Sequence, residues 1–404
     1  MGKLKFVILA LAVVISLPSC GTPPVQGPSN TQIQAANNEI TSENTPAPLR
    51  EEYFALLTST EKDYVVHAMR LGLSAIRIGN RDFAARIFDQ AIKRVEAMQE
   101  GSEQAERAKS KFVGDEQKWF KGEAYERAAL YLYRGLLYLS DEDFGNAAAC
   151  GKRTELMDIA THEEDQGDWY SAEWLLAYAS LLQEDTTTAH DALARADKFP
   201  SKQGSVPPPI GNANLLVIIE AGNGPIKARK GQYGECLAIL EGEDRTKKVQ
   251  ITLGSVVSPP IETAAAENIY HQASTRGKRQ VDYILDGKAN FKAATDIAGD
   301  VGIAGGAATM ATSHSETQSL VGAGMIVAGL IGKGISSSAN PEADIRSWDN
   351  LPHSIFLCSL SVPANTTTVT VNGLDYQGVT TMEVTKELTI DPKRKVNELW
   401  LRMP

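Results

Sequence analysis

The sequence contains few of the residues from which metal, redox and disulfide sites are built. Its 404 residues include only six histidines and four cysteines. No histidine lies in an HExxH motif or at another metal-ligand spacing. The Gly-x-Ser-x-Gly elbow of serine hydrolases is absent as well. We therefore predict no catalytic residue, no metal site and no cofactor.

The sequence also lacks an excess of basic residues. The chain has 40 lysines and arginines against 50 aspartates and glutamates, which gives a net charge of −10. Nucleic acids and anionic lipid surfaces attract basic proteins. The composition therefore argues against a nucleic-acid partner and against membrane binding by charge.

Long apolar runs are limited to the N-terminus. The run from Phe6 to Leu17 follows two lysines and has one polar residue, which is typical of a secretory signal and too short for a spanning helix. It leads into "LPSC", which resembles a bacterial lipobox and implies a signal peptide over 1–19 and lipidation of Cys20. Gly21 favours the outer membrane, facing the periplasm. The alternative is a plain signal peptide with an incidental cysteine.

The other three cysteines do not form a complete disulfide framework, because their number is odd. Cys150 falls in a helical pattern and is predicted to be a buried thiol. The spacing leaves open whether Cys236 and Cys358 pair.

Residues 20–50 are predicted to be a flexible tether behind the lipidated cysteine. The stretch from Gly21 to Leu49 has no aromatic residue and few large apolar ones, so burial cannot offset the entropy of ordering it. A fully stretched tether of this length reaches about 90 Å.

Residues 51–200 show a helical pattern that repeats three times. In each repeat, small residues recur along a first predicted helix, a turn follows, and further small residues recur along a second predicted helix. This resembles the tetratricopeptide (TPR) pattern, whereas the alternative is a helical bundle with accidental periodicity. The repeating positions are Gly72, Ala75, Ala84, Phe88 and Ala91, then Gly135, Tyr138, Ala147, Gly151 and Thr154, then Ala177, Ser180, Ala189, Leu193 and Ala196.

Four tyrosines and one charge pair follow the first helix of the second repeat. Glu123 and Arg127 are spaced i,i+4 and are expected to pair on one face of the helix. The tyrosines would supply contact area on a concave partner-binding face, or else pack in the core. They are Tyr125, Tyr131, Tyr133 and Tyr138.

The second half changes to strand patterns after the proline-rich 205–212. We predict a mixed strand and helix region over 213–287 and a small antiparallel β module over 341–404. Gly222, Gly224 and Pro225 form a turn after the first strand rather than a phosphate loop, since no Gly-Lys-Ser/Thr follows.

A glycine- and alanine-rich stretch over 288–340 lies between these regions. It is predicted to be a helical hairpin that packs against the protein or a partner. The alternative is a membrane-inserting hairpin, which its short apolar arms disfavour. Beyond it, Asp344 and Arg346 are expected to form an ion pair and Trp348 to anchor against the sheet.

Three segments occur in the order known from one bacterial family. They are "GEAYERAALYLYRGLLYL" (122–139), "EAGNGPIKARK" (220–230) and "EADIRSWDNLP" (342–352). Together they resemble a family of TPR-containing lipoproteins that has no assigned chemistry. The resemblance implies an envelope protein, with a loose association to lipoprotein activators of peptidoglycan synthases.

The sequence thus predicts an α+β protein with an N-terminal TPR-like all-α solenoid, a mixed region and a small C-terminal antiparallel β module. We expect a lipid-anchored scaffold without catalysis that binds an envelope protein through its repeats. One alternative is a cell-wall hydrolase that uses carboxylates or histidine, such as Asp344, Asp349 or His353. Another is a subunit of a secretion or pore assembly that uses the 288–340 hairpin.

Overall fold

The computed structural model describes residues 27–100, 119–158, 167–199, 204–231, 236–254, 259–275 and 342–403. The predicted signal peptide, Cys20 and the glycine- and alanine-rich hairpin lie outside the described residues. No helix in the described ranges combines the length and the hydropathy needed to span a bilayer.

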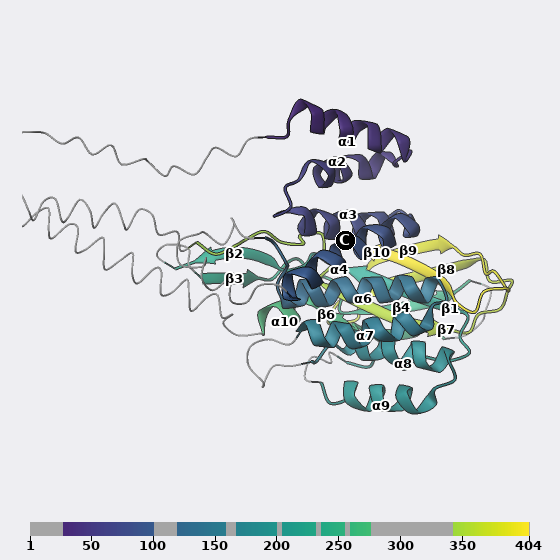
Figure 1. The fold of residues 1–404 in the computed structure, drawn as a ribbon. Helices are drawn as coiled ribbons and strands as arrows, with labels where there is room; N and C mark the ends of the chain where they lie inside the picture. Colours follow the sequence, from purple (N-terminus) through teal and green to yellow (C-terminus); the bar gives the residue numbers. More distant parts are fainter. Residues whose placement is uncertain are drawn as a thin grey trace, which may run out of the picture.

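The first half of the described chain consists of stacked helix pairs (Figure 1). This confirms the predicted α+β class with an N-terminal helical region. A short 3₁₀ turn at Ala47–Leu49 joins the helices of the first pair. The pairs are α1 (Asn30–Ser42) with α2 (Arg50–Thr58), α3 (Tyr64–Arg77) with α4 (Arg81–Glu100), α6 (Ala124–Ser140) with α7 (Phe144–Asp158), and α8 (Tyr170–Leu182) with α9 (Thr186–Ala196).

Small residues at the predicted positions allow the helices to approach closely. A Cβ atom on Gly72 would lie under 3.0 Å from the Phe88 ring of the paired helix. A Cβ on Gly135 would lie 2.6 Å from Leu175 and 2.8 Å from Cys150. Since real Cβ atoms do not approach that closely, the helix spacing depends on glycine at these positions.

The predicted tether is wrong over its second half, which forms helix α1. Ser29 and Gln32 make a reciprocal capping box at the start of this helix. Ala36 and Ile40 are buried on one face of α1. Two apolar positions at helical spacing are enough here because α2 provides a surface for them to pack against.

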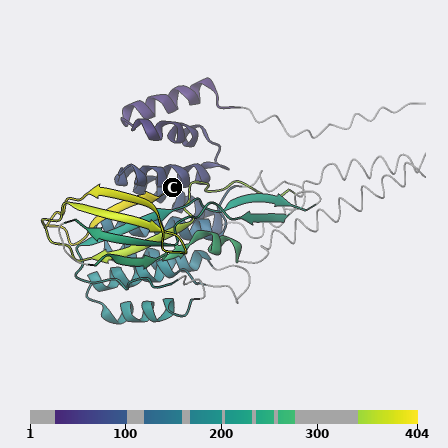
Figure 2. The ribbon, with the colours of Figure 1, turned by 180° about the vertical axis from the view of Figure 1, so that it is seen from behind.

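The strands form two four-stranded sheets and one ribbon. The inner sheet has the order β10-β1-β7-β6, and the outer sheet has the order β5-β4-β8-β9. The ribbon pairs β2 with β3 and projects from the body (Figures 1 and 2). The bounds are β1 Leu215–Ala221, β2 Ile226–Lys230, β3 Cys236–Leu240, β4 Lys248–Leu253, β5 Ile261–Ala264, β6 Glu267–Asn268, β7 Ser354–Leu360, β8 Thr368–Leu374, β9 Thr380–Glu387 and β10 Asn397–Met403, with helix α10 at Ile269–Ser274.

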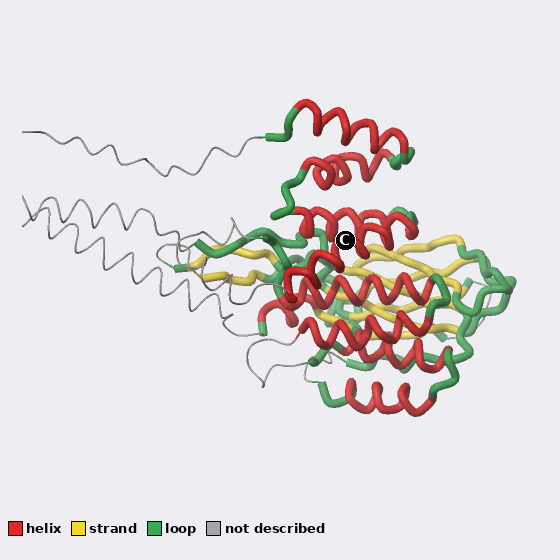
Figure 3. The backbone as a smooth tube through the Cα atoms, viewed as in Figure 1, coloured by secondary structure: helices red, strands yellow, loops and turns green. Residues whose placement is uncertain are grey.

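The inner sheet lies between the helices and the outer sheet, so the described chain forms three layers (Figures 2 and 3). Strand β1 is buried at every residue. Leu216 and Ile218 belong to the core shared with the helices, whereas Val217 and Ile219 belong to the core shared with the outer sheet. The apolar run at the start of this strand, residues 215–219, follows from burial on both faces.

The predicted division into a mixed region and a separate C-terminal module is wrong at the level of strand pairing. Strand β1 pairs with β10 in parallel and with β7 in antiparallel orientation. Strand β4 pairs with β8. Both sheets therefore combine strands from the two sides of residues 276–341.

Candidate functional site

Of the predicted partner-binding tyrosines, Tyr133 faces the inner sheet, whereas the Tyr131 hydroxyl donates to Glu96 of α4. Tyr125, Tyr131 and Tyr133 are buried, and Tyr138 is half-buried. The Tyr133 ring stacks on Trp400 of β10, with 6.2 Å between ring centroids. The inner sheet thus fills the space where a TPR-like array would accept a partner. The prediction of a partner site on these tyrosines is wrong for the three buried rings.

The three segments that carry the family resemblance meet at one buried carboxylate, that of Glu126. Its Oε2 accepts a hydrogen bond from Lys227 Nζ at 2.6 Å, and its Oε1 accepts one from the Trp348 backbone N–H at 2.7 Å. Glu126 is fully buried, and the Lys227 side chain is 1% exposed. Lys227 also donates to the Arg346 carbonyl. The three segments thus build one joint between the helices, the ribbon and the inner sheet.

A second buried carboxylate, Glu220 of β1, ties the helices to the inner sheet. It accepts hydrogen bonds from Tyr133 Oη and from Arg77 Nε, both at 2.6 Å. Arg402 of the neighbouring β10 lies 4.0 Å away. Burial, and then the Glu220 charge, raise the pKa of Tyr133 well above its usual range. The phenol therefore stays protonated and donates to the carboxylate.

Glu123 and Arg127 both lie at the start of α6, where the Glu123 charge favours the charged form of Arg127. Glu123 caps α6 in a reciprocal capping box with Glu126. The Arg127 guanidinium donates to the carbonyls of Gly122 and Met157. Burial lowers the pKa of Arg127. Both residues fix the start of α6, which carries Glu126 into the joint.

The Gly222–Pro225 segment is a tight turn at the end of β1, as predicted. Gly222 has a φ of +65°, a left-handed conformation that favours glycine. Gly224 donates its backbone N–H to the Leu351 carbonyl, so the turn is joined to the segment that carries Trp348. The backbone groups of this turn bind protein groups rather than an open site.

The 342–352 segment docks on the helices. Arg346 pairs with Asp344 at 2.6 Å, as predicted, and with Asp63 before α3 at 2.7 Å. Trp348 packs against Phe88 and Tyr133, each with 5.9 Å between ring centroids. Trp348 is therefore anchored against helices α4 and α6, not primarily against the sheet. Its ring fills the space between their aromatic residues.

The residues of the hydrolase alternative lie in separate environments. Asp349 pairs with Arg70 at 2.8 Å, whereas Asp344 pairs with Arg346. His353 is buried, with Nδ1 3.2 Å from Asp244 Oδ2 and Nε2 3.2 Å from Glu241 Oε1. Both ring nitrogens thus face carboxylates of the protein. Sequence reasoning missed these two acids, because they lie about 110 residues before the histidine.

The cysteines of the described residues form no disulfide between Cys236 and Cys358. Cys150 and Cys358 are buried thiols, which confirms the prediction for Cys150. Burial raises the pKa of each of these two thiols to about 12. They are therefore inert groups of the core at neutral pH.

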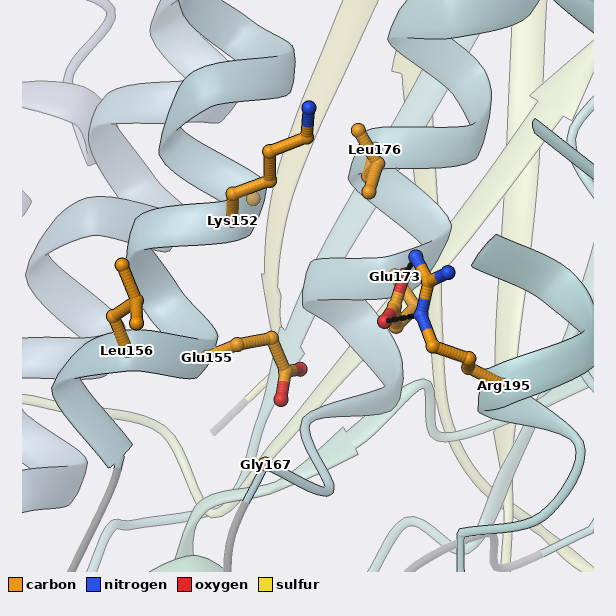
Figure 4. Close-up of a pocket in the computed structure, with 8 residues that line it drawn as sticks. Lys152, Glu155, Leu156, Gly167, Glu173, Leu176 and Arg195 are labelled. Carbon is orange, nitrogen blue, oxygen red and sulfur yellow. Dashed lines mark hydrogen bonds and ion pairs between the residues drawn. The ribbon is translucent and has the colours of Figure 1, made fainter. Parts of the chain in front are cut away.

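An open cavity of about 440 Å³ lies between α7, α8 and α9 (Figure 4). Glu155 of α7 extends into it, and on the far wall Arg195 of α9 binds Glu173 of α8 through two hydrogen bonds of 2.6 and 2.8 Å. Burial, followed by the charge of Glu173, raises the pKa of Glu155 to about 9. The full lining is Gly151, Lys152, Glu155, Leu156, Gly167, Glu173, Leu176 and Arg195.

The sequence held one signal for this cavity, at Gly151. The repeat pattern has Phe88 at the equivalent position of the first repeat. A Cβ on Gly151 would lie 2.8 Å from the Ala172 carbonyl oxygen, so no larger residue fits against α8. Glycine in place of a large residue at position 151 therefore allows close contact between α7 and α8 beside the cavity.

The described residues contain no group of three or more histidine, cysteine, aspartate or glutamate side chains placed to hold a metal ion. Comparisons of the chain with protein-family models, with curated proteins and with solved structures found no match.

Proposed function

We propose that the protein is a membrane-anchored lipoprotein scaffold of the bacterial cell envelope that binds a protein partner and carries out no catalysis. The anchor is the lipid on Cys20, as the lipobox resemblance implies. The partner surface is the outer side of the third and fourth helix pairs, around the cavity between α7, α8 and α9.

One observation carries this choice of surface. The inner sheet covers one side of the helix array with strands that contribute Glu220 and Trp400. Stacked helix repeats bind partners through pre-formed surface, and the surface that remains here is the outer side. On it, the cavity has a volume within the range of about 300–1,000 Å³ that is usual for binding sites. Leu156 at its rim is 51% exposed, which provides an apolar contact.

The test is site-specific photo-crosslinking of the full-length lipoprotein in intact cells. A photoreactive residue replaces Leu156 in one variant and Val379 in the control variant. Val379 is similarly exposed, at 56%, but lies in the loop between β8 and β9 of the outer sheet. We expect one stoichiometric envelope protein to crosslink from position 156 and not from position 379.

Two results would overturn this proposal. Crosslinking of a partner from position 379 alone would place the binding surface on the outer sheet. No crosslink from either position, with the protein abundant in the membrane, would remove the scaffold function. A control with Cys20→Ala reports on the anchor, since loss of the lipid should release the protein from the membrane and reduce crosslinking.

A further inference from the structure

The outer sheet ends on a strand whose far edge has no strand partner among the described residues. Strand β9 is last in the order β5-β4-β8-β9 and pairs on its β8 side. At the opposite end of the sheet, the Ala264 N–H of β5 donates to the Ser205 carbonyl, so that edge is partly covered. An unpaired strand edge is a template for pairing with another chain. Strand β9 is therefore a candidate contact strand.

The pairing of β9 with β8 shows which backbone groups point outward. Leu388, the residue after β9, donates its N–H to the Thr367 carbonyl across the β8–β9 ladder. Because the backbone groups of successive strand residues point to opposite sides, those of Glu383, Thr385 and Glu387 face away from β8. These outward groups make no hydrogen bond to the backbone of the described residues.

The core between the two sheets is left incomplete at this edge. Met382 and Val384 of β9 pack against that core but are only half-buried. Glu383, Thr385 and Glu387 are exposed on the other face of the strand. A further strand beside β9 would cover Met382 and Val384 and leave the charged residues in solvent.

We propose that this further strand is β9 of a second copy of the chain. The two β9 strands pair in antiparallel orientation about a two-fold axis at Val384, which joins the two outer sheets into one. Such a contact is self-complementary, because the same residues face each other on both copies. It lies on the outer sheet and is independent of the partner surface that we propose on the helices.

The charges of β9 select Val384 as the residue on the axis. With Glu383 on the axis, two Glu383 carboxylates would oppose each other, and with Thr385 on it, Glu383 would oppose Glu387. Like charges directly opposite each other are destabilising. With Val384 on the axis, Glu383 lies opposite Thr385 of the second copy, and the two exchange their outward backbone hydrogen bonds. Met382 on the axis would also avoid like charges, but the strands would then overlap over fewer residues.

Lys386 restricts pairing with other strands. It lies on the same side of β9 as Val384 but is exposed, and an inward charge of this kind protects a sheet edge against unspecific pairing. With Val384 on the axis, Lys386 lies opposite Met382 of the second copy. Its methylenes cover the Met382 side chain while the ammonium group stays in water. The edge thus accepts its own copy and disfavours an apolar strand.

The experiment is disulfide crosslinking of the full-length chain with Val384→Cys under mild oxidation in membranes. Opposite residues of an antiparallel pair that share no backbone hydrogen bond have Cα atoms about 4.5 Å apart, which a disulfide spans. We expect a disulfide-linked homodimer on a non-reducing gel. In the matched control Lys386→Cys, the two cysteines lie four residues apart along the ladder, about 13 Å, and should not link. The unaltered chain, which keeps Cys236, gives the background.

A pair of charge variants tests the same contact without a new cysteine. Thr385→Glu places a carboxylate opposite Glu383 of the second copy, whereas Thr385→Lys places an ammonium group there. Both variants lose the same hydroxyl contact with Thr370. Because the contact occurs twice in the dimer, the dimer dissociation constant should be roughly 10- to 30-fold larger for Thr385→Glu than for Thr385→Lys. Sedimentation equilibrium of the full chain in detergent measures both constants.

No homodimer from Val384→Cys, or equal dissociation constants for the two Thr385 variants, would overturn the proposal. A crosslink from Lys386→Cys as strong as that from Val384→Cys would overturn the position of the axis. A disulfide from Val384→Cys to a different protein, without a homodimer, would overturn the second copy as the occupant. These results are separate from the photo-crosslinking result, because a self-crosslink contains this chain alone. A dimer that forms while position 156 crosslinks nothing would preserve the β9 contact and remove only the scaffold function.

Discussion

The buried pair of Glu126 and Lys227 allows a quantitative test of the joint between the helices and the ribbon. We consider Lys227→Met, which retains most of the length of the side chain and removes its charge. Glu126 would remain fully buried with an uncompensated charge. It would still accept hydrogen bonds from the backbone N–H groups of Trp348 at 2.7 Å and Glu123 at 2.8 Å.

These distances set the expected size of the effect. Two unit charges 2.6 Å apart attract by about 6 kcal/mol at the effective dielectric constant of about 20 that suits protein sites. Desolvation offsets part of this attraction, and removal of one partner from a buried pair costs about 3–5 kcal/mol. Because two backbone donors still hold Glu126, we expect Lys227→Met to lower the free energy of unfolding by about 3 kcal/mol.

The assay is urea unfolding followed by tryptophan fluorescence, since Trp348 is buried beside the pair. The double variant Glu126→Gln with Lys227→Met should lose less than the sum of the single losses, by about 2 kcal/mol. Arg245→Ala, which breaks an exposed pair with Glu243, should change the free energy of unfolding by less than about 0.5 kcal/mol. A loss below about 1 kcal/mol for Lys227→Met, or additive losses in the double variant, would refute a coupled buried pair.

Two further predictions concern stability. The pKa of Glu155 is raised to about 9 and that of Glu267 to about 8, above their ordinary value of 4.5, so the folded state binds more protons and stability should fall as the pH rises from about 5 to 9. Urea unfolding midpoints across this range measure how stability changes with pH, and Glu267→Gln should make that change smaller. The same pH dependence in the variant and in the unaltered protein would contradict the raised pKa of Glu267. Gly72→Ala should lower the free energy of unfolding by about 1–3 kcal/mol, because the new methyl group meets the Phe88 ring. The control Gly145→Ala should raise it by about 0.5–1 kcal/mol in the same assay, because no atom lies closer than 3.9 Å to the new Cβ and alanine favours the helix.

The elements themselves could be predicted from local patterns. Small residues at Gly72 and Gly135 marked the helix crossings because close approach permits nothing larger there. The apolar run of β1 and the alternating strands near the C-terminus had the periods of buried and half-buried strands. The turn at Gly222 was recognisable because a left-handed residue after a strand favours glycine.

The pairing of these elements could not be predicted, because it depends on contacts between distant residues. Glu126 and Lys227 are 101 residues apart, and each looks like an ordinary surface charge in its own segment. The tyrosines of α6 have the same spacing whether they face a partner or the protein's own sheet. The cavity around Glu155 likewise combines α7, α8 and α9, and only the departure at Gly151 hinted at it.

The last strand explains why the helix array and the sheets are one unit. On the side of β10 that faces the helices, Glu398 pairs with Arg81, Trp400 stacks on Tyr133, and Arg402 lies beside Glu220. The C-terminal seven-residue strand therefore contributes to the burial of the side of the helices that other repeat arrays keep open for partners. Because strands cover this side of the array, the partner surface that we propose lies on its outer side. This is where the cavity with the unpartnered Glu155 oxygen is found.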